Sequence, residues 1–349
     1  MERAKKPPAI PVSSPLPQPT ITISVEEDKV QASLASGESV TVNLLGATVV
    51  AWKLAEGEEQ LFLSQKAVLD GSKPIRGGIP LVFGPPPKDH ATSALPQHGF
   101  ARNAYWEFLG KSTSESEGQD GDSSVKLDFG LSTSMLSDKF KSDWPYEFGL
   151  VYSVTLSKDS LGTTLQVRNK GEKPFDFQVL LHSYFKVEKC RTGSITPIYE
   201  KYYSSLTCIL RNFSAKIVQQ DIAKIRILNL QSKTYVDKVL NASTHVESSP
   251  ALAITQETDR VYQSLDPKVP IVIANGDDND SSLFSISRES LDDIVVWNPW
   301  IEKAKGMADF APDDGYKNMI CVEAGSVVKW QTLEAGESWE CGQVVKSRL

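Results

Sequence analysis

Residues 20–54 read TITISVEEDKVQASLASGESVTVNLLGATVVAWKL and contain four short runs in which apolar and polar side chains alternate. The runs are ITISVEE, KVQASLAS, SVTVNLL and ATVVAWKL, and Glu, Asp and Gly residues stand between them. Successive side chains of a strand point to opposite faces, so this alternation predicts strands with one buried face. The short turns between the runs favour antiparallel pairing.

The same pattern continues toward the C-terminus, and no long helical period interrupts it. Further runs of this kind are AYWEFLG, VKLDFGL, FGLVYSVTLS, TTLQVRN, FDFQVLLHSYFKV, VPIVIAN, SLFSIS, NMICVEAG and SWECGQVV. Many strands spaced by about ten residues indicate a sandwich or barrel rather than alternating βαβ units. We therefore expect an all-β fold, a large antiparallel β-sandwich with a few short helices.

Two segments with different roles are expected. Residues 1–19 are rich in proline and serine and show no hydrophobic period. Such a composition buries too little apolar surface to fold, so these residues are predicted to form a flexible tail. The remaining residues, 20–349, are long for one domain, but β-sandwiches of this size do form single units. We expect one β-sandwich domain there.

Composition and charge exclude several classes of partner. The net charge is −7 and the pI about 5.3, so no global basic field attracts nucleic acid or an anionic membrane. No apolar run approaches the ~18 residues of a membrane helix. The four cysteines are Cys190, Cys208, Cys321 and Cys341, and they lack CxxC and metal-finger spacing. This spacing favours reduced, buried thiols in a cytoplasmic protein. We expect a monomer that binds a small molecule.

One irregular stretch, residues 70–103, combines many prolines and glycines with Arg76, Arg102 and two of the four histidines. Proline fixes φ and glycine adopts backbone angles that other residues avoid, so the stretch predicts rigid loops. Loops of this kind often carry function. A long surface connection fits the same composition.

Two strand-like runs contain candidates for acid and base chemistry. In FDFQVLLHSYFKV, alternation puts His182 on the more polar face. In MICVEAG, it puts Glu323 on the same face as Cys321, and partial burial would raise the pKa of that carboxyl toward the range of a general base. A hydrogen-bonded structural histidine and a structural glutamate fit these patterns as well.

Other polar and aromatic residues have less specific surroundings. Asp259 in QETDRVYQ fits a solvated, salt-bridged turn. Trp297 and Asn298 lie in VVWNPWIEKAKGMADF, where tryptophan can stack on a sugar ring or fill a core. No phosphate loop, GxGxxG, HExxH or GxSxG motif occurs, and the histidine spacing indicates no metal centre, although the fold could still bring ligands together.

Several long blocks of the sequence resemble the hexose-6-phosphate mutarotases, also called glucose-6-phosphate 1-epimerases, and most closely their fungal members. The blocks are LDGSKPIRGGIPLVF, LPQHGFARNAYWEFLG, LLHSYFKVE, QETDRVYQ, VVWNPWIEKAKGMADF and MICVEAG. They follow the order of the family's motifs and cover the chain from about residue 21 to its end. The resemblance implies the large β-sandwich of the related aldose 1-epimerases, a supersandwich like that of galactose mutarotase.

The resemblance also assigns roles. It implies His182 and Glu323 as the catalytic pair, and no metal or other cofactor. It implies four residues that contact the substrate: Arg76, Gln97, Arg102 and Asp259. We expect three further residues to support the site: His98, Trp297 and Asn298. His98 would orient Arg102 or Gln97, and a purely structural role is the alternative for it.

The implied reaction exchanges the α and β anomers of D-glucose 6-phosphate or related hexose 6-phosphates. A base takes the O1 proton, an acid protonates the ring oxygen, and the opened ring recloses after rotation about the C1–C2 bond. Two arginines match a phosphate dianion. The chain departs from the family in two places. It has Ala324 where the family usually has proline, and Ser326 in the region where the family often has histidine. The alternatives are an aldose 1-epimerase of unphosphorylated sugars and a noncatalytic sugar-phosphate-binding regulator.

Overall fold

The computed structural model describes residues 20–24, 28–84, 90–114, 124–187, 222–276 and 282–348. Its strands form three antiparallel sheets, so the all-β prediction is confirmed. The expected tail, residues 1–19, lies outside the described residues, as do Cys190 and Cys208. None of the helices in these ranges is both long and apolar enough to span a bilayer.

The alternating stretch within residues 20–54 forms a four-stranded meander in the order β1-β2-β3-β4. Its strands are β1 Thr20–Ser24, β2 Lys29–Ser33, β3 Ser39–Asn43 and β4 Thr48–Lys53. Alternation is visible in β2, where Val30 and Ala32 are buried and Gln31 is exposed. The predicted strands and their buried face are therefore confirmed.

The second sheet has eight strands and carries most of the candidate site. Its order is β14-β13-β16-β19-β20-β10-β5, and β11 pairs with β20 beside β10. The strands are β5 Leu81–Phe83, β10 Phe175–Leu181, β11 Tyr184–Lys186, β13 Thr234–Asp237, β14 Ser243–Val246, β16 Thr258–Tyr262, β19 Asp293–Asn298 and β20 Met319–Leu333.

The third sheet has nine strands in the order β15-β12-β17-β18-β21-β9-β8-β7-β6. The strands are β6 Glu107–Ser114, β7 Ser124–Ser132, β8 Phe148–Leu156, β9 Ser160–Asn169, β12 Ile225–Leu228, β15 Ala251–Ala253, β17 Ile271–Asn275, β18 Ser282–Glu289 and β21 Ser338–Ser347.

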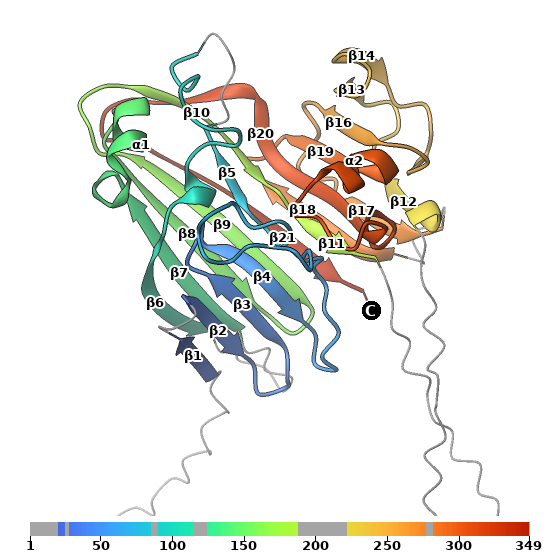
Figure 1. Ribbon diagram of the computed structural model, residues 1–349, viewed down its shortest axis with the longest axis horizontal. Helices are drawn as coiled ribbons and strands as arrows, with labels where there is room; N and C mark the ends of the chain where they lie inside the picture. The colour runs from blue at the N-terminus through green and yellow to red at the C-terminus, as the bar shows by residue number, and fades with distance from the viewer. Residues whose placement is uncertain are drawn as a thin grey trace, which may run out of the picture.

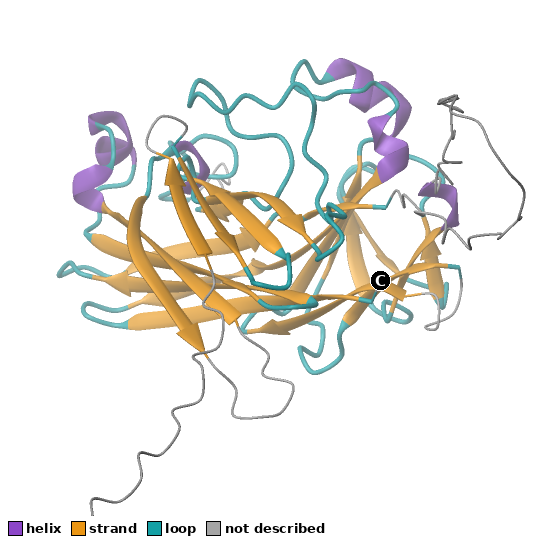
Figure 2. Ribbon diagram, turned by 90° about the horizontal axis from the view of Figure 1, so that it is seen from below, coloured by secondary structure: helices purple, strands orange, loops and turns teal. Residues whose placement is uncertain are grey.

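Helices are short and lie at the periphery of the strands (Figure 2). They are α1 Asp138–Asp143 and α2 Trp300–Gly306, with 3₁₀ turns η1 Ala101–Asn103, η2 Thr133–Met135, η3 Ile222–Lys224 and η5 Gly315–Asn318. The expectation of a few short helices is thus confirmed. In Figure 1, α2 and the strands β13, β14, β16 and β19 lie toward one end of the molecule, and β1, β2 and β6 toward the other.

One continuous hydrophobic core joins the three sheets. Trp52 of β4 contacts Phe284 of β18, with 6.5 Å between ring centroids, and Phe284 lies 4.9 Å from Phe185 of β11. All three rings are at most 1% exposed. Full burial of one such side chain stabilises the fold by about 1.5–3 kcal/mol, so these contacts fix how the sheets stack.

The proline- and glycine-rich stretch folds back onto the second sheet. Within it the structure describes one edge strand, β5, and the η1 turn. The backbone N–H of Tyr184 donates to the carbonyl of Gly78 over 2.9 Å, and that of His182 donates to Pro80 over 3.1 Å. These bonds tie the segment that carries Arg76 to the segment that carries His182.

Gly99 makes a close approach that only glycine permits. Its φ is +75°, and a Cβ built there would lie 1.6 Å from the carbonyl oxygen of Phe83. The backbone therefore passes directly against β5, which holds the neighbouring segment of Gln97, His98 and Arg102 in place.

We predict that Gly99→Ala lowers the free energy of unfolding by about 2–4 kcal/mol, because a strained φ and a backbone clash add together. Gly57→Ala is the matched control, since Gly57 has a φ of +82° but nothing within 4 Å of a built Cβ. It should cost about 1 kcal/mol. Urea unfolding measures both; equal costs would refute the close approach.

Candidate active site

A cavity of about 410 Å³ lies over one face of the eight-stranded sheet. Its walls come from strand ends, from the Arg76 and Gln97–Arg102 loops, and from α2. The lining residues are Arg76, Gln97, His98, Arg102, Leu180, His182, Lys238, Asp259, Val295, Trp297, Lys303, Met307 and Glu323. All the residues implied as catalytic or substrate-binding therefore line one cavity, together with His98 and Trp297.

Strand register explains why residues far apart in sequence meet here. Asp259 of β16 pairs with Trp297 of β19, and Trp297 pairs in turn with Cys321 of β20. Directly paired residues of an antiparallel sheet point to the same face. Glu323 lies two residues beyond Cys321 and so shares this face. Figure 1 shows β16, β19 and β20 in this order.

His182 and Glu323 face each other at the bottom of the cavity. Nδ1 of His182 lies 3.4 Å from Oε1 of Glu323, and their side chains are only 10% and 2% exposed. The imidazole stacks on Tyr184 with ring centroids 4.6 Å apart and meets Trp297 edge to face at 6.0 Å. The aromatic rings thus hold the imidazole in one orientation toward the carboxyl group.

Burial controls the protonation of this pair. It raises the pKa of Glu323 well above its ordinary value, and the nearby Asp259 carboxylate adds to the increase. Burial also lowers the pKa of His182 well below its ordinary value, helped by His98 and Arg102. Both shifts favour the neutral forms, a carboxylic acid and a neutral imidazole. In these forms the carboxyl group has one O–H to donate, and the imidazole has one nitrogen that can accept a proton.

Arg76 is held firmly at the cavity wall. Its Nε and NH2 groups each lie 3.2 Å from Oδ2 of Asp309, and its NH1 donates to the hydroxyl of Tyr184 over 3.3 Å. Burial alone would lower the pKa of Arg76, but its contacts with Tyr184 and Asp309 raise it. Asp309 compensates the charge of Arg76 and fixes its position; the sequence analysis did not identify Asp309.

Arg102 differs because no carboxylate among the described residues pairs with it. NH2 of Arg102 donates to the backbone carbonyl of Gln97 over 3.1 Å, and its buried Nε has no hydrogen-bond partner within the described part of the chain. Burial lowers its pKa to about 10, which still leaves the guanidinium charged at neutral pH. A positive charge of this kind is available to an anionic ligand.

His98 contacts His182 and lies close enough to Arg102 and Arg76 for their charges to influence it. Its backbone φ is +69°, and its ring meets the ring of His182 edge to face at 5.8 Å. Burial lowers the pKa of His98 to about 3, and the charges of Arg102 and Lys238 contribute. It is therefore neutral at physiological pH, and its strained backbone is consistent with a position dictated by the site.

Two lysines that the sequence analysis did not identify also line the cavity. Nζ of Lys238, directly after β13, lies 3.9 Å from Oδ1 of Asp259, and Nζ of Lys303 on α2 lies 2.9 Å from Oε1 of Glu257. Burial raises the pKa of Asp259, and Lys238 offsets part of this increase. Lys303 was within reach of the sequence analysis because it belongs to the block around Trp297. Lys238 belongs to none of the quoted blocks.

Asn298, expected to support the site, does not line the cavity. It is fully buried, and its side-chain amide donates to the backbone carbonyls of Tyr316 and Met319 over 2.9 and 3.0 Å. Its Oδ1 accepts a hydrogen bond from the N–H of Trp300. These bonds join the start of α2 to the start of β20, so Asn298 holds two walls of the cavity together.

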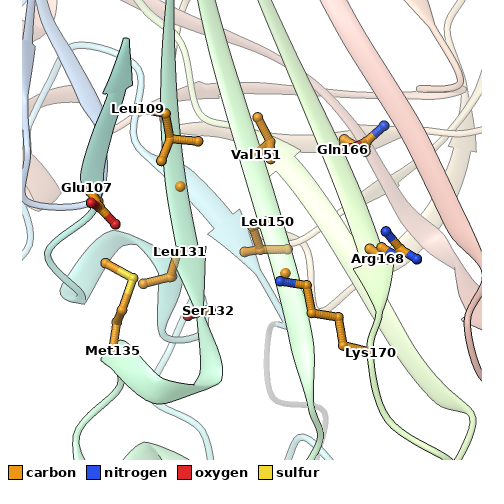
Figure 3. A pocket seen from close by; sticks show the side chains of 12 residues that line it. Glu107, Leu109, Leu131, Ser132, Met135, Leu150, Val151, Gln166, Arg168 and Lys170 are labelled. Carbon is orange, nitrogen blue, oxygen red and sulfur yellow. The ribbon is translucent and has the colours of Figure 1, made fainter.

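A second cavity, of about 320 Å³, lies on the outer face of β6, β7, β8 and β9. Figure 3 shows Glu107, Leu109 and Met135 on one side of it and Gln166, Arg168 and Lys170 on the other. Glu107 is the one acidic residue among those that line it, and no histidine or cysteine is present. This cavity lacks the acid and base pair found in the first.

Comparison with known proteins gives the family. The model of the family described as aldose 1-epimerase matches residues 28–346. The chain belongs to the aldose 1-epimerase family. The resemblance implied this epimerase family, and the match covers nearly the whole described chain.

Individual relatives of this chain are consistent with its membership of the aldose 1-epimerase family. A protein of Cenchrus ciliaris named "Putative glucose-6-phosphate 1-epimerase" is 31% identical over 88% of this chain and 80% of its own length. A protein of Escherichia coli K12 with the same name is 31% identical over 89% and 85%. The crystal structure of "a putative mutarotase (YeaD)" from Salmonella typhimurium superposes with a TM-score of 0.69 at 24% identity, covering 97% and 96% of the two chains. The shared fold is the mutarotase-like sandwich.

The charges around Glu323 yield a prediction for its pKa. Asp259→Asn should lower the pKa of Glu323, because the Asp259 carboxylate raises it, whereas Lys238→Met should raise it, because the Lys238 ammonium lowers it. The carboxyl carbon of ¹³C-labelled glutamate, assigned by its loss in Glu323→Gln, reports the titration by NMR. Shifts in the same direction in both variants would contradict the described electrostatics.

Proposed function

We propose that this protein interconverts the α and β anomers of D-glucose 6-phosphate and related hexose 6-phosphates. One observation carries the proposal: the His182–Glu323 pair lines the same cavity as the guanidinium of Arg102, which no carboxylate among the described residues pairs with. The pair supplies acid and base chemistry, and the guanidinium supplies an anchor for phosphate. The names of the plant and enterobacterial relatives support the same activity.

The reaction needs one proton donor and one proton acceptor. Ring opening removes the O1 proton and protonates O5, and reclosure after rotation about the C1–C2 bond reverses both transfers. His182 and Glu323 together hold one exchangeable proton when burial keeps them neutral overall. In our proposal this proton first moves from Glu323 to His182; the Glu323 carboxylate then takes the O1 proton while the His182 imidazolium gives its proton to O5. The substrate carries its own carbonyl, so the mechanism has no step that requires a cofactor.

The cavity suits a compact polar ligand with one anionic end. Its volume of about 410 Å³ lies in the range of small-molecule sites. Asp259 and Gln97 on the rim offer acceptors and donors for sugar hydroxyls, and Trp297 offers an aromatic edge beside the reacting pair. Arg102 and Arg76 lie toward the loop side, where we place the phosphate.

We predict that His182→Ala and Glu323→Gln each reduce catalysed anomer exchange of glucose 6-phosphate by about 10²–10⁴-fold, the usual contribution of a positioned acid or base. Two-dimensional NMR exchange spectroscopy measures the rate above the spontaneous background. Glu302→Gln on the exposed side of α2 is the control, since that side chain is 88% exposed and should leave the rate unchanged. Normal exchange in both site variants would reject the proposed pair.

A second candidate, mutarotation of unphosphorylated sugars, has a specific observation in its favour. Three of the four cations that line the cavity are compensated by carboxylates: Arg76 by Asp309, Lys238 by Asp259 and Lys303 by Glu257. Only Arg102 remains for a phosphate among the described cations of the cavity. The two candidate functions therefore differ in whether Arg102 binds a phosphate group of the substrate.

We predict that Arg102→Met raises KM for glucose 6-phosphate by about 10–100-fold while kcat changes little, since a charge-assisted hydrogen bond is lost. KM for glucose should be unaffected. An unchanged KM for the phosphate ester would favour the unphosphorylated substrate. Thermal stabilisation by glucose 6-phosphate without accelerated exchange would instead indicate a noncatalytic sugar-phosphate-binding protein.

A further inference from the structure

At the floor of the cavity and directly beneath it, the fold brings together three side chains that transition metals favour. The ligand atoms of His182, Cys321 and Glu323 all lie within 4.8 Å of one another, and all three residues are buried. The sequence spacing indicated no metal centre, because His182 lies more than a hundred positions before the other two. The fold creates this cluster by pairing the end of β10 and the start of β11 with β20.

We propose that these three residues form a binding site for a divalent transition-metal ion of the Zn²⁺ class, and that the bound ion blocks the reaction. Metal binding itself is independent of the proposed function, whereas the blocking effect rests on it. An ion at this place would occupy both groups that transfer protons to and from the sugar. The site would thus be inhibitory.

Two of the three ligand atoms already lie at the separation that a bound ion requires. Tetrahedral ligands at Zn–N and Zn–O distances of about 2.1 Å and Zn–S of about 2.3 Å are separated by roughly 3.3–3.8 Å. His182 and Glu323 are already 3.4 Å apart. Nδ1 of His182 is buried and has no aligned hydrogen-bond partner among the described residues, so no existing bond must break for it to bind an ion.

The donor set and its charge also fit. Imidazole nitrogen, thiolate sulfur and carboxylate oxygen together suit Zn²⁺ and its neighbours Co²⁺ and Cd²⁺ rather than the hard ions Mg²⁺ and Ca²⁺. Binding would release the carboxyl proton of Glu323 and the thiol proton of Cys321 to solvent, and the resulting carboxylate and thiolate neutralise the double charge of the ion. A neutral complex avoids the large cost of burying net charge beneath the cavity.

The surroundings make the cluster stiff and leave one side open. Cys321 pairs with Tyr184 of β11 and with Trp297 of β19, so strands flank it on both sides. Its thiol packs in a small apolar cluster with these two rings. The sides of His182 and Glu323 that face the cavity provide a path for the ion and leave a coordination position directed toward the space of the sugar.

The test uses Co²⁺ as a spectroscopic probe of a single thiol. The full-length variant Cys190→Ser/Cys208→Ser/Cys341→Ala retains Cys321 as its only cysteine. We expect one equivalent of Co²⁺ to produce a thiolate-to-cobalt charge-transfer band in the near ultraviolet, together with the intense visible bands of a tetrahedral ion. Zn²⁺ should displace Co²⁺ and remove both. Absence of the thiolate-to-cobalt band from this variant would overturn the proposed metal site.

Two further measurements separate this site from other causes of inhibition. Adding Cys321→Ala should abolish the cobalt band and raise the Zn²⁺ concentration for half-inhibition at least tenfold, with each rate normalised to that variant's own metal-free rate. Glucose 6-phosphate should compete with Zn²⁺. Equal inhibition with and without Cys321 would reject the blocking role. If the protein did not exchange anomers at all, the proposed function would fail while the cobalt band still tested the metal site.

Discussion

The antiparallel register of β16, β19, β20 and β10 is the constraint on which the candidate site depends. Glu323 lies on β20, which pairs with β19 on one side and β10 on the other, and it is only 2% exposed. A shift of one residue would turn Glu323 into the hydrophobic core and turn Val322 into the cavity. Burial, the shifted pKa and the contact with His182 all follow from this register.

Charge around the cavity is arranged in pairs with one exception. Arg76, Lys238 and Lys303 each have a carboxylate close by, and the pairs hold the cavity walls in position. Arg102 is left with backbone contacts only among the described partners. A site that leaves one half-buried guanidinium uncompensated is less stable empty than occupied by an anion. In our proposed function, this cost is recovered when the phosphate of the substrate binds.

The same close packing that suits proton exchange also suits a cation. An imidazole and a carboxyl group 3.4 Å apart can share a proton, and they can equally share a metal ion once a third ligand is near. Cys321 supplies that ligand because side chains two residues apart on a strand share a face. The proposed inhibitory site is therefore a consequence of where β20 places its residues.

Sequence alone determined the all-β class, the opening meander, and the faces on which His182 and Glu323 lie, because strand alternation is a local property of two-residue period. Residue types and motif order also indicated Arg76, Gln97, Arg102 and Asp259. Only the tertiary structure revealed Asp309 beside Arg76, Lys238 beside Asp259 and Cys321 beside His182, and Asn298 as a support outside the cavity. Those relations join segments up to hundreds of residues apart, and which strands pair, and in what register, depends on packing across three sheets.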